Sequence, residues 1–229
     1  MNLTENHIEE LYKFTRQHYV EHYDVQTELV DHLANDIENT WIEKPNLTFK
    51  EARDISFKKF GVFGFMHVIE KKQKAMYKRY IKILWRFVKE WFTLPKIITT
   101  GFVFILFFII LQNEYAFQVL IISFLVLSGY DIFLLIKKMK KRKVKEKKRW
   151  LLKELIGETR GGFSFLTLIN AYNIINIFKI DLSILSIYWI ALISSIATLL
   201  CIIFYVSTII LPQKAEQLLE ETYPEYKMV

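Results

Sequence analysis

The chain has 229 residues, of which 52% are hydrophobic and 24% are charged, and its formal net charge is +7. Its single cysteine, Cys201, has no partner within the chain, which excludes a fold held by internal disulfides. Residues 1–70 hold 7 basic and 13 acidic residues, so the part that reads as soluble is acidic and no nucleic-acid partner is expected.

Residues 1–62 are predicted to form a small cytoplasmic bundle of short helices. Thr4 is a suitable N-cap for the first helix. A second helix is expected over 24–42, because apolar residues recur there every four positions. These positions are Leu29, Leu33, Ile37 and Trp41. Thr48 and Glu51 have the spacing of a capping box, which predicts the start of a third helix.

A row of polar residues lies on one face of the second predicted helix. Glu28, His32 and Asp36 are spaced four residues apart, and Asp31 is adjacent to them. Carboxylates and an imidazole in such a row could contribute ligands to a divalent metal. Zinc takes three or four ligands in fixed geometry, which one helix rarely supplies alone. The row is therefore interpreted as a polar seam between helices, and no metal or cofactor is predicted.

The stretch ELVDHLANDIE at 28–38, followed by LTFKEARDISFKKFG at 47–61, resembles the HAAS-type helical domain. The resemblance covers about 1–70 and does not extend to the rest of the chain. It implies a small cytoplasmic domain placed before transmembrane helices, in a bacterial sensing or signalling protein without known catalytic residues. The best-matching residues are Glu28, Leu29, Asp31, His32 and Leu33.

Residues 63–96 are predicted to form a basic amphipathic helix next to the membrane. The segment 71–96, here called the basic collar, holds 9 basic residues and one acid, Glu90. Its basic stripe consists of Lys74, Lys78, Lys82 and Arg86. Helices of this composition commonly lie at the bilayer interface, where anionic lipid is an expected partner. A binding site for a partner helix is the alternative interpretation.

Two long apolar blocks, 97–136 and 162–211, follow the collar. About 20 apolar residues span the hydrocarbon core as a helix, so the region 97–211 is predicted to be a transmembrane domain. The fold class is therefore all-α, a polytopic membrane protein with four transmembrane helices. The expected spans are about 97–112, 116–136, 163–179 and 184–211.

The loop between the second and third spans, 137–160, holds 12 basic and 3 acidic residues. Because positively charged loops stay in the cytoplasm, this loop and the collar are expected on the cytoplasmic side. Four spans then place the tail 212–229 on that side as well. Residues 1–60 contain no apolar segment of the signal-peptide kind, so the amino terminus is expected there as well. The expected location is the bacterial inner membrane.

Polar residues within the predicted spans are candidates for function. Asp131 is either an intramembrane acid with a role or a shallow partner of basic residues near the headgroups. Asn170, Asn173 and Asn176 form an arc on the third span, which suits hydrogen bonds between helices or a polar path.

No catalytic or phosphate-binding motif occurs in the sequence, so an enzyme is not expected. The leading hypothesis is a sensor or regulator that couples a membrane helix bundle to a cytoplasmic helical domain. The acidic domain and the basic collar and loop could dock, in competition with anionic lipid. A protein partner or a homo-oligomer is compatible with this hypothesis. The alternative is a small transporter or channel component that uses Asp131 and the asparagine arc.

Overall fold

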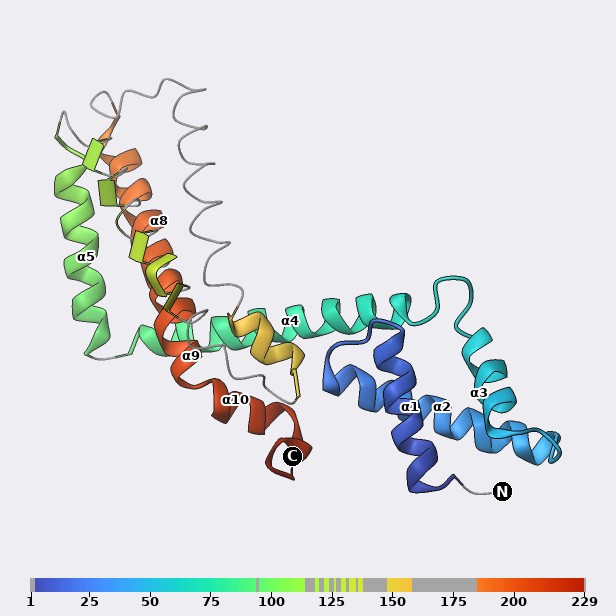
Figure 1. The fold of residues 1–229 in the computed structure, drawn as a ribbon. Helices are drawn as coiled ribbons and strands as arrows, with labels where there is room; N and C mark the ends of the chain where they lie inside the picture. Colours follow the sequence, from blue (N-terminus) through green and yellow to red (C-terminus); the bar gives the residue numbers. More distant parts are fainter. Residues whose placement is uncertain are drawn as a thin grey trace. The chain divides into compact units, whose positions relative to one another are not determined.

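The computed structural model describes residues 3–93, 95–113, 148–157 and 185–228, with separate positions between 118 and 137 (Figure 1). These residues form helices and turns with one isolated bridge, which confirms the all-α prediction. Asp131, the three arc asparagines and the expected third span lie outside the described residues. The chain divides into two compact units: unit 1 is Met1–Arg79 with Glu146–Glu154, and unit 2 is Tyr80–Lys145 with Leu155–Val229.

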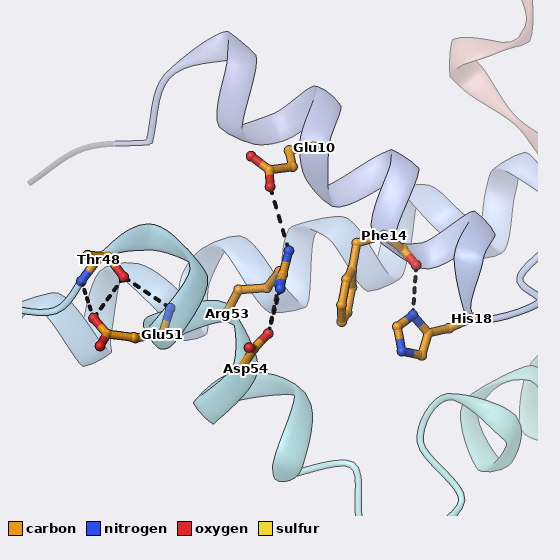
Figure 2. Close-up of polar contacts among 7 residues, drawn as sticks. All are labelled: Glu10, Phe14, His18, Thr48, Glu51, Arg53 and Asp54. Atoms are coloured by element: carbon orange, nitrogen blue, oxygen red, sulfur yellow. Dashed lines mark hydrogen bonds and ion pairs between the residues drawn. The ribbon is translucent and has the colours of Figure 1, made fainter.

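Unit 1 contains the helices that the sequence predicts for its amino-terminal part. They are α1 (Glu5–Gln17), α2 (Tyr23–Glu43), α3 (Phe49–Lys58) and the first part of α4 (Met66–Trp91). The Thr4 hydroxyl accepts the backbone N–H of His7, which caps α1. Thr48 and Glu51 form the predicted capping box, in which the Glu51 carboxylate accepts the backbone N–H of Thr48 at 2.9 Å (Figure 2).

The core of unit 1 forms around α2, whose apolar face is fully enclosed. Leu29, Leu33 and Ile37 have no exposed surface, and Trp41 is 4% exposed. The other elements contribute Leu11 and Phe14 from α1, Ala52 from α3, Phe65 before α4, and Leu151. Because the spacing of four residues places these side chains on one helix face, α2 can pack against several neighbours at once.

Arg53 of α3 ties α1 and α3 together at the edge of this core. Its guanidinium lies 3.6 Å from the Glu10 carboxylate and 2.7 Å from the Asp54 carboxylate (Figure 2). The same guanidinium stacks over the Phe14 ring at 4.4 Å. Phe14 also contacts His18, whose Nδ1 lies 2.9 Å from the Phe14 carbonyl oxygen.

Unit 2 is built on two apolar helices that run side by side, α5 (Lys96–Ile110) and α8 (Ile187–Tyr205) (Figure 1). Their contact buries Phe107 and Leu111 against Ile190 and Ala197. Other large apolar side chains of both helices are exposed, among them Ile98, Phe102, Ile109, Tyr188, Trp189 and Ile196. Exposed apolar surface of this extent is typical of a surface that meets lipid or another protein.

The helix that begins with α8 continues through a π-helical turn, η2 (Val206–Ile210), into the short α9 (Leu211–Gln213). The Leu211 N–H bonds to the Val206 carbonyl, five residues back. Pro212 explains the wider turn, because it has no N–H to donate and its ring would crowd the carbonyl four residues earlier. The tail then forms α10 (Ala215–Thr222) and η3 (Pro224–Met228), with Leu218 and Leu219 buried.

One helix in the described part of the chain, Ile187–Gln213, is long and apolar enough to cross a membrane. Its 27 residues overlap most of the fourth predicted span, 184–211. Helix α5, in the place of the first predicted span, has only 15 residues, and a 91° bend separates it from α4, so that pair counts at most as one broken span. The structure therefore supports membrane association and does not establish four spans.

Candidate functional site

The end of the basic run, which we define as residues 137–149, and the residues after it lie against the start of α2, which is far away in the sequence. The Tyr23 N–H donates to the Arg149 carbonyl at 2.7 Å, and His22 and Arg149 form a bridge between parallel backbones. The Leu151 N–H donates to the Asp24 carboxylate at 3.2 Å. We call this contact the loop anchor: residues 148–154 on one side and residues 21–24 on the other, all within unit 1.

Charged side chains surround this backbone contact. Arg149 forms an ion pair with Glu21, and the Lys148 ammonium lies 4.0 Å from the centre of the Tyr23 ring. On the other side, a ring nitrogen of His22 lies 3.2 Å from the Glu154 carboxylate. The predicted docking of the basic loop on the acidic domain is thus present for the end of the basic run. The part of the run at 138–147 lies outside the described residues.

Apolar burial contributes more to the loop anchor than its ion pairs do. Trp150 is 4% exposed and meets the Tyr23 ring edge to face, with centroids 5.3 Å apart. Leu151 is 3% exposed and joins the core of unit 1. Burial of one such side chain is worth about 1.5–3 kcal/mol, whereas an exposed ion pair adds about 0–1 kcal/mol. The apolar side chains therefore supply most of the stability of this contact.

Two tyrosine rings stack on each other at the loop anchor. The rings of Tyr12 and Tyr23 are 5.9 Å apart, and the Tyr12 hydroxyl donates to the Thr27 hydroxyl at 3.2 Å. Burial raises the pKa of Tyr12 above the usual 10.0. Burial also opposes ionisation of Tyr23, but hydrogen bonds with Lys148, Tyr12 and Thr27, together with the positive charge of Lys148, outweigh it, so the pKa of Tyr23 lies below 10.0. The tyrosine next to the basic loop should therefore ionise first.

Ionisation of Tyr23 is expected to report whether Lys148 is docked. Because the folded-state pKa is depressed, the stabilising effect is complete above the unfolded-state pKa and is lost as pH falls through the folded-state pKa. An ultraviolet titration of phenolate, taken as the difference between the natural chain and Tyr23→Phe, measures this pKa. In Lys148→Met it should move upward. An unchanged Tyr23 titration in Lys148→Met would show that the ammonium does not act on the ring.

A cavity of about 1230 Å³ adjoins the anchor between α1, the start of α2 and Arg53. Acidic side chains (Glu9, Glu10 and Glu21) and basic ones (Lys13, Arg16, Arg53, Lys148 and Arg149) both line it. Charges of both signs around one cavity favour neither an anionic nor a cationic ligand.

The predicted polar row on α2 faces lysines. Glu28 pairs with Lys72, and the Asp36 carboxylate lies 3.3 Å from the Lys59 ammonium. Glu28, His32 and Asp36 line a groove of about 640 Å³ together with these lysines. The structure thus brings both carboxylates of the row to basic partners from outside α2.

Asp31 and His32 are exposed on the same helix. Within the described part of the chain, no three His, Cys, Asp or Glu side chains lie close enough together to hold a metal ion.

The transporter alternative depends on Asp131, Asn170, Asn173 and Asn176, all outside the described residues. In α8, the buried hydroxyls of Ser194 and Thr198 donate to carbonyls of their own helix at 2.7 Å.

Sequence reasoning did not find the loop anchor as a site. Its apolar part, Trp150 with Leu151 and Leu152, directly follows the basic run and reads as the first turn of an ordinary loop helix. A Trp–Leu–Leu group placed between charged segments was the available signal, since such a group needs a surface to pack against. Nothing in the local pattern identified residues 21–24 as that surface.

Comparison of the chain with protein-family models, with curated proteins and with solved structures found no match. The resemblance of residues 1–70 to the HAAS-type domain therefore stays a prediction.

Proposed function

We propose that the protein is a non-enzymatic sensor or regulator of the bacterial inner membrane, in which membrane helices control a cytoplasmic helical domain through the loop anchor. The proposed arrangement has four spans, with both termini and the loop 137–160 in the cytoplasm. The helix Ile187–Gln213, which is long and apolar enough to cross a membrane, and the exposed apolar sides of α5 and α8 support the membrane part. The loop anchor supports the coupling and carries the proposal.

The anchor gives the helical domain a second attachment to the proposed membrane helices. The first attachment is α4, which leads directly from unit 1 toward α5. The second is the segment 148–154, which belongs to the loop between the proposed second and third spans. Since a domain held at two points cannot follow both when they move apart, a shift among the spans must favour either the docked or the released anchor.

Anionic lipid is the proposed competitor for the anchor. Ten Lys or Arg lie in 137–149, and the last two of them, Lys148 and Arg149, contact Tyr23 and Glu21. Basic residues close to an anionic surface gain about 1 kcal/mol each, which is similar to the value of an exposed ion pair. A moderate change in lipid charge can therefore shift these side chains between the domain and the membrane.

Hydrogen exchange of the full-length protein in nanodiscs tests this coupling. Exchange at the Tyr23 and Leu151 amides, which take part in the anchor, should be faster in phosphatidylglycerol than in phosphatidylcholine, by about fivefold for each basic residue transferred to lipid. The double variant Lys148→Gln/Arg149→Gln should exchange at the same rate in both lipids.

Lys50→Gln is the matched control, because Lys50 is an exposed lysine of α3 outside the anchor. This variant should keep the lipid dependence of the natural chain. Identical exchange of the natural chain in both lipids would remove the coupling proposal. So would a lipid dependence that survives in the Lys148→Gln/Arg149→Gln variant.

A further inference from the structure

The turn between α3 and α4 holds two apolar side chains out into solvent. Val62 is 98% exposed and Phe63 is 80% exposed, whereas Phe65, two residues later, is 2% exposed. Most surface apolar residues occur singly, so two adjacent and almost fully exposed ones at the tip of a turn are unusual.

The backbone on both sides of the pair fixes this outward direction. Gly61 and Gly64 have φ angles of +77° and +53°, which residues with a side chain rarely adopt. The Gly64 N–H donates to the Gly61 carbonyl at 3.2 Å, closing the turn around Val62 and Phe63. A Cβ on Gly64 would lie 3.0 Å from the Phe57 ring, so the turn also sits closely against the core.

Basic residues flank the exposed pair in the sequence. Residues 58–79 hold seven Lys or Arg and one acid, Glu70, a net charge of +6. Lys59 and Lys72 are used in ion pairs with the polar row of α2. Lys58 and Lys71 are exposed, and neither forms an ion pair with a residue that the structure describes. The turn is thus an apolar tip with positive charge on both of its flanks.

We propose that Val62 and Phe63 insert into the interfacial layer of an anionic bilayer, with Lys58 and Lys71 at the headgroups. This inference rests on the proposed function, because it assumes that the chain is held at a membrane. Transfer of the apolar tip out of water has a favourable free energy. The lysine ammonium groups are attracted to anionic headgroups, while the methylene chains of these lysines lie in the interface. A protein groove that bound Phe63 would have to be acidic to accept the same flanks.

Accessibility of a nitroxide at position 62 tests the insertion in the full chain. Cys201→Ala removes the only cysteine, and Val62→Cys then places a single spin label on the tip. In nanodiscs containing phosphatidylglycerol, the label should be more accessible to oxygen than to a water-soluble nickel chelate. The matched control is Ile42→Cys, also on unit 1 and 77% exposed, where the nickel chelate should have full access.

Charge dependence provides the second measurement. In the Lys58→Gln/Lys71→Gln background, the ratio of inserted to free label at position 62 should fall about fivefold for each lysine removed. Nickel access at position 62 equal to that at position 42 would overturn the proposal. Exclusion of both reagents would also overturn it, since that result indicates a protein partner or a second copy. These outcomes are independent of exchange at the loop anchor, so each proposal can fail alone.

Discussion

Replacement of Trp150 by alanine is expected to release the loop anchor from unit 1. The side chain is 4% exposed and packs against the Tyr23 ring, so its removal leaves a large cavity between the two sides of the loop anchor. These two sides are far apart in the sequence, so no short stretch of chain holds them together. Truncation of a buried tryptophan typically costs about 3–5 kcal/mol. The free energy of opening, measured by hydrogen exchange at the Tyr23 and Leu151 amides of the full-length protein, should fall by this amount.

Trp150→Phe is the conservative comparison, because a smaller ring still fills most of the same space. It should retain well over half of the protection that Trp150→Ala loses. Comparable loss in both variants would show that the indole itself is required. If Trp150→Ala leaves these amides as protected as in the natural chain, the backbone bonds and ion pairs hold the anchor without it, and apolar burial is not the main source of its stability.

Leu33→Ala is expected to destabilise all of unit 1. Leu33 lies at the middle of the enclosed face of α2, has no exposed surface and belongs to the core shared by α1, α3 and Leu151. Deletion of buried leucine side chains costs about 2–5 kcal/mol, depending on how far the surroundings collapse. Exchange of the central α2 amides in the full-length protein should accelerate accordingly, and the anchor amides should follow because they share this core.

Ile42→Ala is the control for Leu33→Ala, since Ile42 belongs to the same helix but is 77% exposed. A substitution at such a position usually changes stability by about 0.5 kcal/mol or less. Equal effects of Leu33→Ala and Ile42→Ala would mean that helix propensity, and not burial, governs α2.

Charge and apolar contact have separable roles at the loop anchor. Added salt screens the exposed Arg149–Glu21 pair, whereas burial of Trp150 and Leu151 is insensitive to screening. The anchor should therefore remain docked at high ionic strength. Its dependence on lipid charge should then disappear, because salt weakens the attraction of the basic run to the membrane as well.

The sequence by itself determined the local structure of unit 1. Thr4, Thr48 and Glu51 lie at the helix starts that they predict, and the spacing of Leu29, Leu33, Ile37 and Trp41 predicted the buried face of α2. Caps and periodicity act within a few residues, so they can be read from a short stretch of chain. The same local reasoning identified the apolar segment that became the membrane-length helix Ile187–Gln213.

The tertiary structure alone decided which surfaces meet. Periodicity showed that Glu28 and Asp36 share a face, but the pairing of these residues with Lys72 and Lys59 depends on how α3 and α4 fold back. Likewise, Trp150 lies more than a hundred residues from Tyr23, and no local pattern connects them. The chemistry of a side chain determines which kinds of partner it can bind. Packing of the whole chain decides which partner it meets, because many surfaces offer the same kind of contact.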